Sequence, residues 1–117
     1  MTDSKGSVNW EFYNERARSF VALMSAGKYE SAAGMLDSTM AGLMPPEALK
    51  KLWVSDIGGI AGKYQSIYEI HNSIVDGYYI SQVIMRHEKI GFGWNLVFDA
   101  AGEISGIWTT GTVWLPD

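Results

Sequence analysis

The sequence contains no cysteine, and this absence excludes disulfides, thiol catalysis and cysteine-based zinc sites. No apolar run comes near the roughly 18–20 residues that a membrane-spanning helix needs, so we expect no membrane span. Basic residues are fewer than acidic residues, 9 against 13, which gives a net charge of −4. Nucleic-acid binders usually carry a basic stripe, whereas the only basic pair here is Lys50-Lys51, on an expected helix surface. We therefore expect neither a nucleic-acid partner nor binding to an anionic membrane.

The length of 117 residues and the apolar content of 47% are typical of one globular domain. A domain of this size buries enough surface to fold without a metal or a disulfide, and we expect no cofactor. Residues 1–7 form a short polar arm, which the apolar segment of a secretory signal does not follow. We expect residues 8–117 to make up the domain, and we expect a cytoplasmic location unless a leader has been removed.

Helical periodicity runs through the first half of the chain. Apolar residues recur at spacings of three and four over residues 8–26, 29–39 and 46–61, which predicts three helices. Gly27 stands where a positive φ would end the first helix, and Met44-Pro45-Pro46 separates the second helix from the third. The inner side of the third helix is predicted to carry Leu49, Leu52, Trp53, Ile57 and Ile60.

From Lys63 onward the period changes from 3.6 to 2, which indicates strands. We predict four of them, over residues 64–75, 78–88, 92–99 and 103–115. Asp76-Gly77 is a strong signal for a two-residue hairpin turn, because both positions of a type I′ turn need a positive φ. The order of helices before strands predicts an α+β fold, and the frequent glycines in the later strands predict a curved four-stranded antiparallel meander.

The hairpin turn fixes which residues share a face of the sheet. It places Val75 opposite Tyr78, Ile70 opposite Val83 and Tyr68 opposite Met85. The face toward the helices is then predicted to carry Tyr68, Ile70, Asn72, Ile74, Tyr79, Ser81, Val83 and Met85, with Phe92, Trp94, Leu96, Phe98, Ile104 and Trp108 from the later strands.

Aromatic residues dominate this inner face, and two interpretations of them remain open. They are either ordinary core or the lining of a small apolar pocket, in which Tyr and Trp would present polar tips. The residues predicted for such a ligand pocket are Tyr13, Tyr68, Asn72, Tyr79, His87, Trp94 and Trp108, with Tyr64 and Ser81 close by.

The histidines, His71 and His87, are predicted on opposite faces of the hairpin. They cannot share one metal ion through the sheet, so we expect no metal site. His71 is expected on the surface near Glu69 and Gln82. His87 is expected on the inner side near Ser66, where a pKa close to working pH would suit an acid or base. The middle of the inner face carries no carboxylate, and we assign no catalytic residue.

Three segments resemble a known group of proteins. They are Ala26-Gly27-Lys28-Tyr29 with Met35-Leu36-Asp37, Leu49-Lys50-Lys51-Leu52-Trp53, and the run from Val97 to Gly106, VFDAAGEISG. The arrangement resembles the cystatin-like cone of nuclear transport factor two, ketosteroid isomerase and the SnoaL-like proteins. Within that group the chain is similar, from Glu15 to Val113, to a bacterial domain of unknown function often found ahead of an α/β-hydrolase domain. The resemblance implies a cone-shaped fold and no catalytic residues.

The outer face of the sheet is predicted to be more apolar than a solvated face needs to be. Large apolar patches usually bind a partner, and many cone-shaped proteins that this chain resembles dimerise sheet to sheet. The residues predicted for a homodimer interface are Ile67, His71, Tyr78, Ile80 and Ile84, with Val75, Val97, Ile107 and Val113 beside them. We therefore expect a small non-enzymatic binding or interaction domain that forms a homodimer and can hold a small apolar ligand. The alternative is a cone-pocket enzyme of the ketosteroid-isomerase or dehydratase type.

Overall fold

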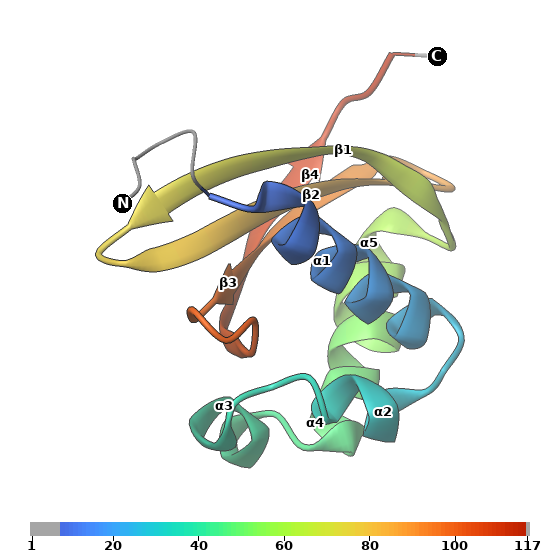
Figure 1. Cartoon of the computed structure of the whole chain (residues 1–117). Helices are drawn as coiled ribbons and strands as arrows, with labels where there is room; N and C mark the ends of the chain where they lie inside the picture. Colours follow the sequence, from blue (N-terminus) through green and yellow to red (C-terminus); the bar gives the residue numbers. More distant parts are fainter. Residues whose placement is uncertain (1–7, 117) are drawn as a thin grey trace.

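The computed structural model describes residues 8–116, which fold as helices followed by an antiparallel sheet. All the helices lie on one side of the sheet, which curves over them (Figure 1). This confirms the predicted α+β architecture. The helical elements are α1 (Trp10–Ser25), α2 (Tyr29–Ala33), α3 (Ser38–Leu43), α4 (Pro46–Lys50), the π-helix η2 (Lys51–Ile57) and α5 (Gly58–Ala61).

Helix α1 follows the prediction to within two residues at each end. The side chain of Asn9 caps it by accepting a hydrogen bond of 3.2 Å from the backbone N–H of Phe12. Gly27, with φ of 75°, ends it in the left-handed region that glycine adopts without strain. Its buried side follows the helical period and consists of Tyr13, Ala17, Phe20, Val21 and Met24.

The helix predicted over residues 29–39 is wrong in one respect, because the structure divides it into α2 and α3. Between them the backbone of residues 35–37 joins the sheet. Ile104 N–H donates to Met35 O, and Asp37 N–H donates to Ile104 O, both at 2.9 Å. The Asp37 carboxylate then caps α3 by accepting from Met40 N–H at 2.8 Å. These sheet hydrogen bonds and the new cap replace the helical ones that periodicity alone predicted.

The helix predicted over residues 46–61 is continuous, but its middle is the π-helix η2. A π-helix hydrogen-bonds five residues apart instead of four, so the side chains that follow are rotated relative to a regular α-helix. Ile57 is fully buried, whereas Ile60, predicted on the inner side, is 56% exposed. The prediction for Ile60 is therefore wrong, and the π-helix gives the physical reason.

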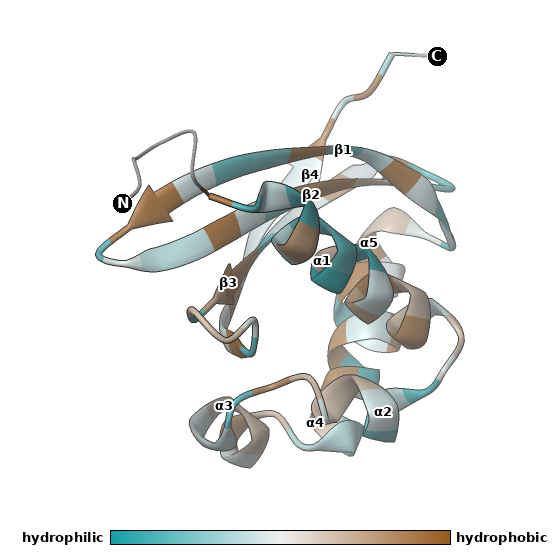
Figure 2. Cartoon of the chain, viewed as in Figure 1, coloured by the Kyte–Doolittle hydropathy of each residue, from teal (hydrophilic) through white to brown (hydrophobic). Residues whose placement is uncertain are grey.

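The sheet has the order β1-β2-β3-β4, with all neighbours antiparallel. Its strands are β1 (Tyr64–Val75), β2 (Tyr78–His87), β3 (Gly91–Phe98) and β4 (Ile104–Val113). The turn between β1 and β2 has positive φ at both Asp76 (52°) and Gly77 (81°), as the sequence predicted. Hydrophilic and hydrophobic stretches both occur along β1 and β2 (Figure 2).

The predicted register holds from Val75 opposite Tyr78 to Ile70 opposite Val83 and then changes. A bulge at Tyr68 places Ile67, not Tyr68, opposite Met85. Ile67 therefore packs against the core, and Tyr68 is 40% exposed with the guanidinium of Arg86 5.2 Å from its ring centroid. The predictions that Tyr68 faces the helices and that Ile67 faces outward are both wrong.

A second irregularity lies at Ser105, between the pairs Ile104–Phe98 and Gly106–Val97. It reverses the faces of residues 106–109, after which a second register shift restores the original faces. Ile107 pairs with Leu96 and packs against the core, whereas Trp108 pairs with Asn95 and is 60% exposed. The predicted inner position of Trp108 and outer position of Ile107 are therefore wrong.

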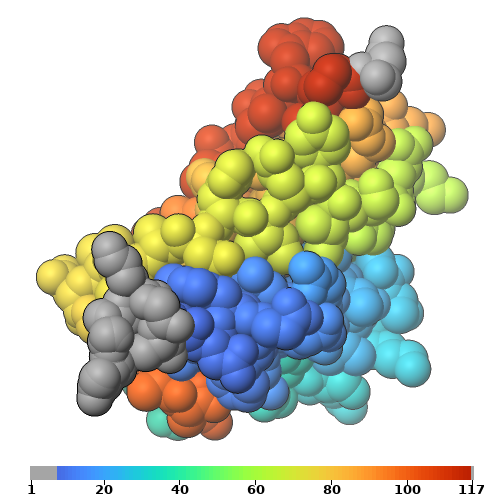
Figure 3. All heavy atoms as spheres, turned by 45° about the horizontal axis from the view of Figure 1, so that its top comes forward, coloured from blue at the N-terminus to red at the C-terminus, as the bar shows by residue number. Residues whose placement is uncertain are grey.

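The hydrophobic core fills the space between the helices and the inner face of the sheet. Its largest fully buried side chains include Trp94, Phe20, Phe98, Met24 and Leu49. The edge strand β1 and helix α1 lie side by side on the molecular surface (Figure 3), so α1 closes one side of the core. The opening beyond the end of α1, where β1 begins and β2 ends, is the position of the candidate site.

Candidate functional site

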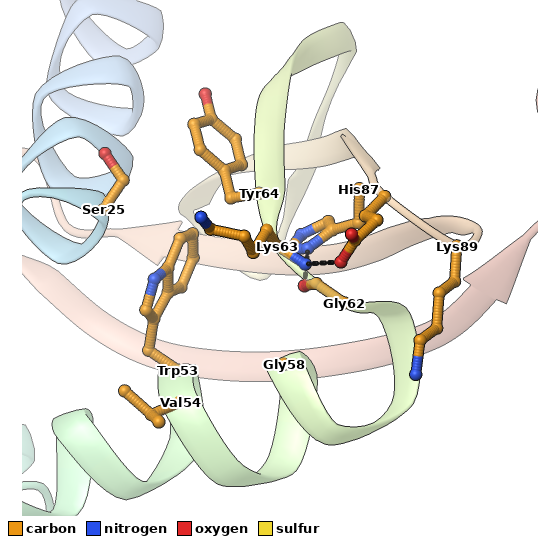
Figure 4. A pocket seen from close by; sticks show the side chains of 10 residues that line it. Ser25, Trp53, Val54, Gly58, Gly62, Lys63, Tyr64, His87 and Lys89 are labelled. Carbon is orange, nitrogen blue, oxygen red and sulfur yellow. Dashed lines mark hydrogen bonds between the residues drawn. The ribbon is translucent and has the colours of Figure 1, made fainter.

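A pocket of about 450 Å³ lies where the start of β1 and the end of β2 meet the helices (Figure 4). We call it the mouth pocket. It collects residues from four parts of the chain: the end of α1, the π-helix with the glycines after it, the start of β1 and the end of β2. Its lining residues are Ser25, Trp53, Val54, Gly58, Gly62, Lys63, Tyr64, His87, Glu88 and Lys89.

Three rings form one wall of the mouth pocket. Trp53 comes from η2, Tyr64 from β1 and His87 from β2. The ring centroids of Trp53 and Tyr64 are 5.5 Å apart, and the ring of His87 lies 6.0 Å from Trp53 and 5.7 Å from Tyr64. Burial raises the pKa of the Tyr64 hydroxyl, so that hydroxyl stays protonated at neutral pH. The wall is thus aromatic and uncharged.

His87 is the polar group of this wall, and only 5% of it is exposed. Its Nδ1 lies 2.9 Å from the carbonyl oxygen of Gly62. A carbonyl can only accept, so Nδ1 carries the hydrogen and Nε2 of the neutral ring holds a lone pair. Burial lowers the pKa of His87, and the hydrogen bond to Gly62 opposes this shift only in part.

Nε2 of His87 is buried without a hydrogen-bond partner among the described residues. An acceptor in this state costs about 1–3 kcal/mol, and most buried polar groups avoid it. The position of the ring also differs from the expectation. A shift in register between Tyr64 and Ser66 places Tyr64, and not Ser66, opposite His87.

The rim of the mouth pocket is held by backbone hydrogen bonds that position its charged residues. Gly62, with φ of 85°, turns the chain from α5 into β1. Glu88 N–H then donates to Lys63 O, and Lys89 N–H donates to Ala61 O, both at 2.8 Å. Lys63 N–H donates to the Glu88 carboxylate at 3.2 Å. The rim thus presents two ammonium groups and one carboxylate, all exposed.

The other residues predicted for a ligand pocket lie elsewhere. Tyr13 stacks on Tyr79 with ring centroids 4.6 Å apart, and its hydroxyl donates to Ala100 O at 3.3 Å. Desolvation raises the pKa of the Tyr13 hydroxyl, with smaller contributions from Tyr79 and Asp99. Trp94 is fully buried in the core. The structure therefore brings His87 of the predicted set to the mouth pocket, together with Tyr64, which was predicted close by.

Asn72 and the buried Ser81 form a half-buried hydrogen-bond network with Asn14 of α1. The amides of Asn14 and Asn72 pair reciprocally, at 3.1 and 2.8 Å. Asn72 Nδ2 also donates to Ser81 Oγ, and that hydroxyl donates to Asn14 Oδ1, both at 3.1 Å. The polar tips predicted for a pocket thus bond one another and fasten α1 to the sheet.

The outer face of the sheet carries the other predicted surface. His71 lies there, as predicted, with Nε2 2.6 Å from a carboxylate oxygen of Glu69 and its backbone opposite Gln82. Tyr78 is exposed and Ile80 is half-buried, whereas Ile84 is buried although no described helix lies over this face. Of the residues predicted for an interface and beside it, Ile67 and Ile107 lie on the inner side.

Two kinds of site are not found in the part of the chain that the structure describes. Within residues 8–116 no three His, Asp or Glu side chains gather in a way that could hold a metal ion. Likewise, none of the described helices has the length and apolar character that crossing a membrane requires.

The model of a family described as "Protein of unknown function (DUF3887)" matches residues 17–107, from the middle of α1 to the inward-facing Ile107. The chain belongs to the DUF3887 family. Comparisons with the curated proteins and with the solved structures find no significant match. The matched range covers the π-helix, the turn at Gly62 and the end of β2. Every residue that lines the mouth pocket of this DUF3887 domain therefore lies within the family region.

Sequence reasoning missed Trp53, Lys63 and Lys89 as neighbours of His87. The spacing of Trp53 fits an inner helix face and so predicts a core position, and the lysines fit any solvated segment. Gly62 is the available signal, because it lets the chain after α5 approach Glu88 and Lys89 more closely than a residue with a Cβ could.

Proposed function

We propose that this DUF3887 domain is a non-catalytic interaction module that forms a homodimer through the outer face of its sheet. The observation that carries the proposal is the character of that face. All the described helices lie on the other side of the sheet, and the uncovered side presents Tyr68, Val75, Tyr78 and Trp108, each at least 40% exposed. Exposed aromatic residues at this density are typical of protein interfaces.

The size of the face supports the proposal. Four strands about ten residues long, with about 3.3 Å per residue and 4.8 Å between strands, cover roughly 600 Å² in projection. Side-chain relief adds to the accessible area, and a stable interface buries about 800 Å² on each partner. One copy of this face is therefore nearly large enough to serve as one half of a stable dimer.

The few charges on the face are already paired or stacked, which favours pairing with an identical face. Glu69 lies against His71, and the guanidinium of Arg86 stacks on Tyr68. Two identical faces related by a two-fold axis must be self-complementary, and neutral apolar surfaces satisfy this more readily than surfaces of one charge.

The test is the oligomeric state of matched lysine variants, measured by sedimentation velocity at tens of micromolar. We expect the unmodified chain to sediment at twice the 12.9 kDa mass of one copy and Ile80→Lys at the single mass. Ile60→Lys is the control, because Ile60 is also an accessible isoleucine but lies on α5, on the helix side of the sheet. We expect it to remain dimeric.

A second variant protects this test against misfolding. Trp108→Glu changes a side chain that is 60% exposed, so it should fold and should also separate the copies. A monomeric unmodified chain, or dimers of both outer-face variants, would refute the proposal.

One observation favours a second candidate function, the cone-pocket enzyme. A buried neutral histidine with a free Nε2, in a pocket, has the state of a general base. Against it, the other side-chain donors of the pocket, Tyr64, Lys63 and Lys89, are half-buried or exposed, so water competes with them for an oxyanion. The test is deuterium exchange of cyclohex-3-enone in D₂O, followed by proton NMR. Exchange that His87→Asn abolishes supports catalysis, and exchange at the buffer rate excludes this isomerase-type reaction.

A further inference from the structure

We propose that the mouth pocket binds a small hydroxylated aromatic carboxylate, whose hydroxyl group donates a hydrogen bond to Nε2 of His87. This site lies on the helix side of the sheet, and the inference does not depend on the homodimer. An experiment that refutes one of the two proposals does not affect the other.

The buried acceptor sets the first requirement for the ligand. Nδ1 of His87 donates to Gly62 O, while Nε2 has no partner in the described residues and is closed off from solvent, so a ligand reaches it only when a side chain of the pocket wall moves aside. Since burial lowers the pKa of His87, the ring is neutral at pH 7 and Nε2 accepts. A matching ligand must therefore bring a donor, and a hydroxyl group is a donor that a small pocket can accommodate.

The wall of the pocket sets the second requirement. Trp53 and Tyr64 lie beside the imidazole of His87 and present aromatic surface in the pocket wall (Figure 4). Planar rings pack well against such a wall, because aromatic pairs prefer offset or edge-to-face contacts. The volume of about 450 Å³ is within the range of small-molecule sites. A one- or two-ring aromatic compound satisfies both conditions.

The rim sets the third requirement. Lys63 and Lys89 supply two positive charges there, and Glu88 supplies one negative charge. In Figure 4 the Lys63 side chain extends toward the Ser25 side of the pocket, away from His87. The net positive rim favours a ligand with an anionic group at the end opposite its hydroxyl. A hydroxylated aromatic carboxylate has this arrangement.

The experiment compares two probes, 6-hydroxy-2-naphthoate and 6-methoxy-2-naphthoate, in the second of which a methyl group replaces the hydroxyl hydrogen and removes the donor. Binding to the full chain at pH 7.5 is measured by calorimetry and by ¹⁵N–¹H NMR shifts of the pocket residues. We expect the hydroxy compound to bind at least tenfold more tightly. Equal affinities, or no binding of either probe at millimolar concentration, would overturn the proposal.

Variants assign the preference to its residues. His87→Asn can keep a donor near the Nδ1 position while removing the Nε2 acceptor, so the ratio of the two affinities should fall to about one. Lys63→Gln should weaken both probes several-fold, whereas Lys28→Gln, an exposed lysine outside the pocket, should leave both unchanged. A hydroxyl preference that survives His87→Asn would contradict the assignment.

The ¹⁵N signal of His87 Nε2 in the unmodified chain keeps the proposal testable if His87→Asn does not fold. A ring nitrogen whose lone pair accepts a hydrogen bond has a different ¹⁵N chemical shift from one whose lone pair is free. We expect 6-hydroxy-2-naphthoate to move this signal and 6-methoxy-2-naphthoate to leave it in place. Identical responses to the two probes would refute the inference.

Discussion

The amide pair between α1 and the sheet offers the most direct test of how the helices are fastened to the sheet. Asn14 and Asn72 exchange two hydrogen bonds, and each also bonds Ser81. Replacing Asn72 with alanine removes its two bonds to Asn14, its bond to Ser81 and a longer bond of 3.4 Å to Ile80 O. Replacing Asn14 with alanine removes three bonds, namely the same two and the one it accepts from Ser81.

The expected magnitudes follow from these bonds. At a net value of about 0.5–1.5 kcal/mol for each hydrogen bond, Asn72→Ala should lower the free energy of unfolding by about 2–4 kcal/mol. Asn14→Ala should cost somewhat less, because alanine is the better helix former by up to about 0.7 kcal/mol. The double variant loses the two shared bonds only once. It should therefore be more stable than the sum of the single effects predicts by about 1–3 kcal/mol.

The assay is urea denaturation of the four proteins of this cycle, followed by circular dichroism and tryptophan fluorescence. Coincident transitions establish two-state unfolding, which the comparison requires. Additive single effects, or a cost below about 0.5 kcal/mol for Asn72→Ala, would show that the network does not fasten α1 to the sheet. That outcome would leave ligand binding, which the sequence predicts for Asn72, as the remaining role of this side chain.

Three further predictions concern the core, the buried histidine and the left-handed glycines. Trp94→Ala should cost about 3–5 kcal/mol in urea denaturation, whereas Trp108→Ala, at an exposed position, should change the stability of the single copy little. Burial lowers the pKa of His87, so as the pH falls this histidine is protonated in the unfolded chain before it is protonated in the folded one. The free energy of unfolding should therefore drop as the pH falls below about 6.5, and His87→Asn should make it depend less on pH. Gly102→Ala should lower the melting temperature more than Gly27→Ala, because both have positive φ but only at 102 would the new Cβ come within 2.6 Å of an aromatic ring.

The sequence predicts the elements of this fold well where one local signal decides them. Asp76-Gly77 allows few turns other than type I′, and the strands on both sides of it begin and end within one residue of their predicted bounds. Gly27 ends α1 for the same kind of reason. The break after α2 was not predictable in this way, because it depends on hydrogen bonds to Ile104, which lies about seventy residues farther along the chain.

The candidate site was harder to predict than the fold. Periodicity assumes that every residue advances the chain by the same angle, and single-residue irregularities at Tyr68, Ser105 and the π-helix break that assumption. Each is stabilised by packing between segments distant in sequence. His87 was placed on the correct side because β2 is regular from its turn to its end. Its neighbours were not, because Trp53 belongs to the π-helix and Tyr64 follows a shift in register.

The two bulges also decide what the outer face offers to a partner. With a regular register, Ile67 and Ile107 would face outward, and Tyr68 and Trp108 would be in the core. The structure exchanges them, so two isoleucines pack inside and two aromatic residues with polar groups lie outside. Trp108 rests over Gly106, where a Cβ would come within 3.3 Å of the indole ring, and Arg86 covers Tyr68. Tyrosine, tryptophan and arginine are the residues enriched at protein interfaces, whereas isoleucine on a solvated sheet mainly favours aggregation. The exchange therefore gives the outer face the composition of a specific contact surface.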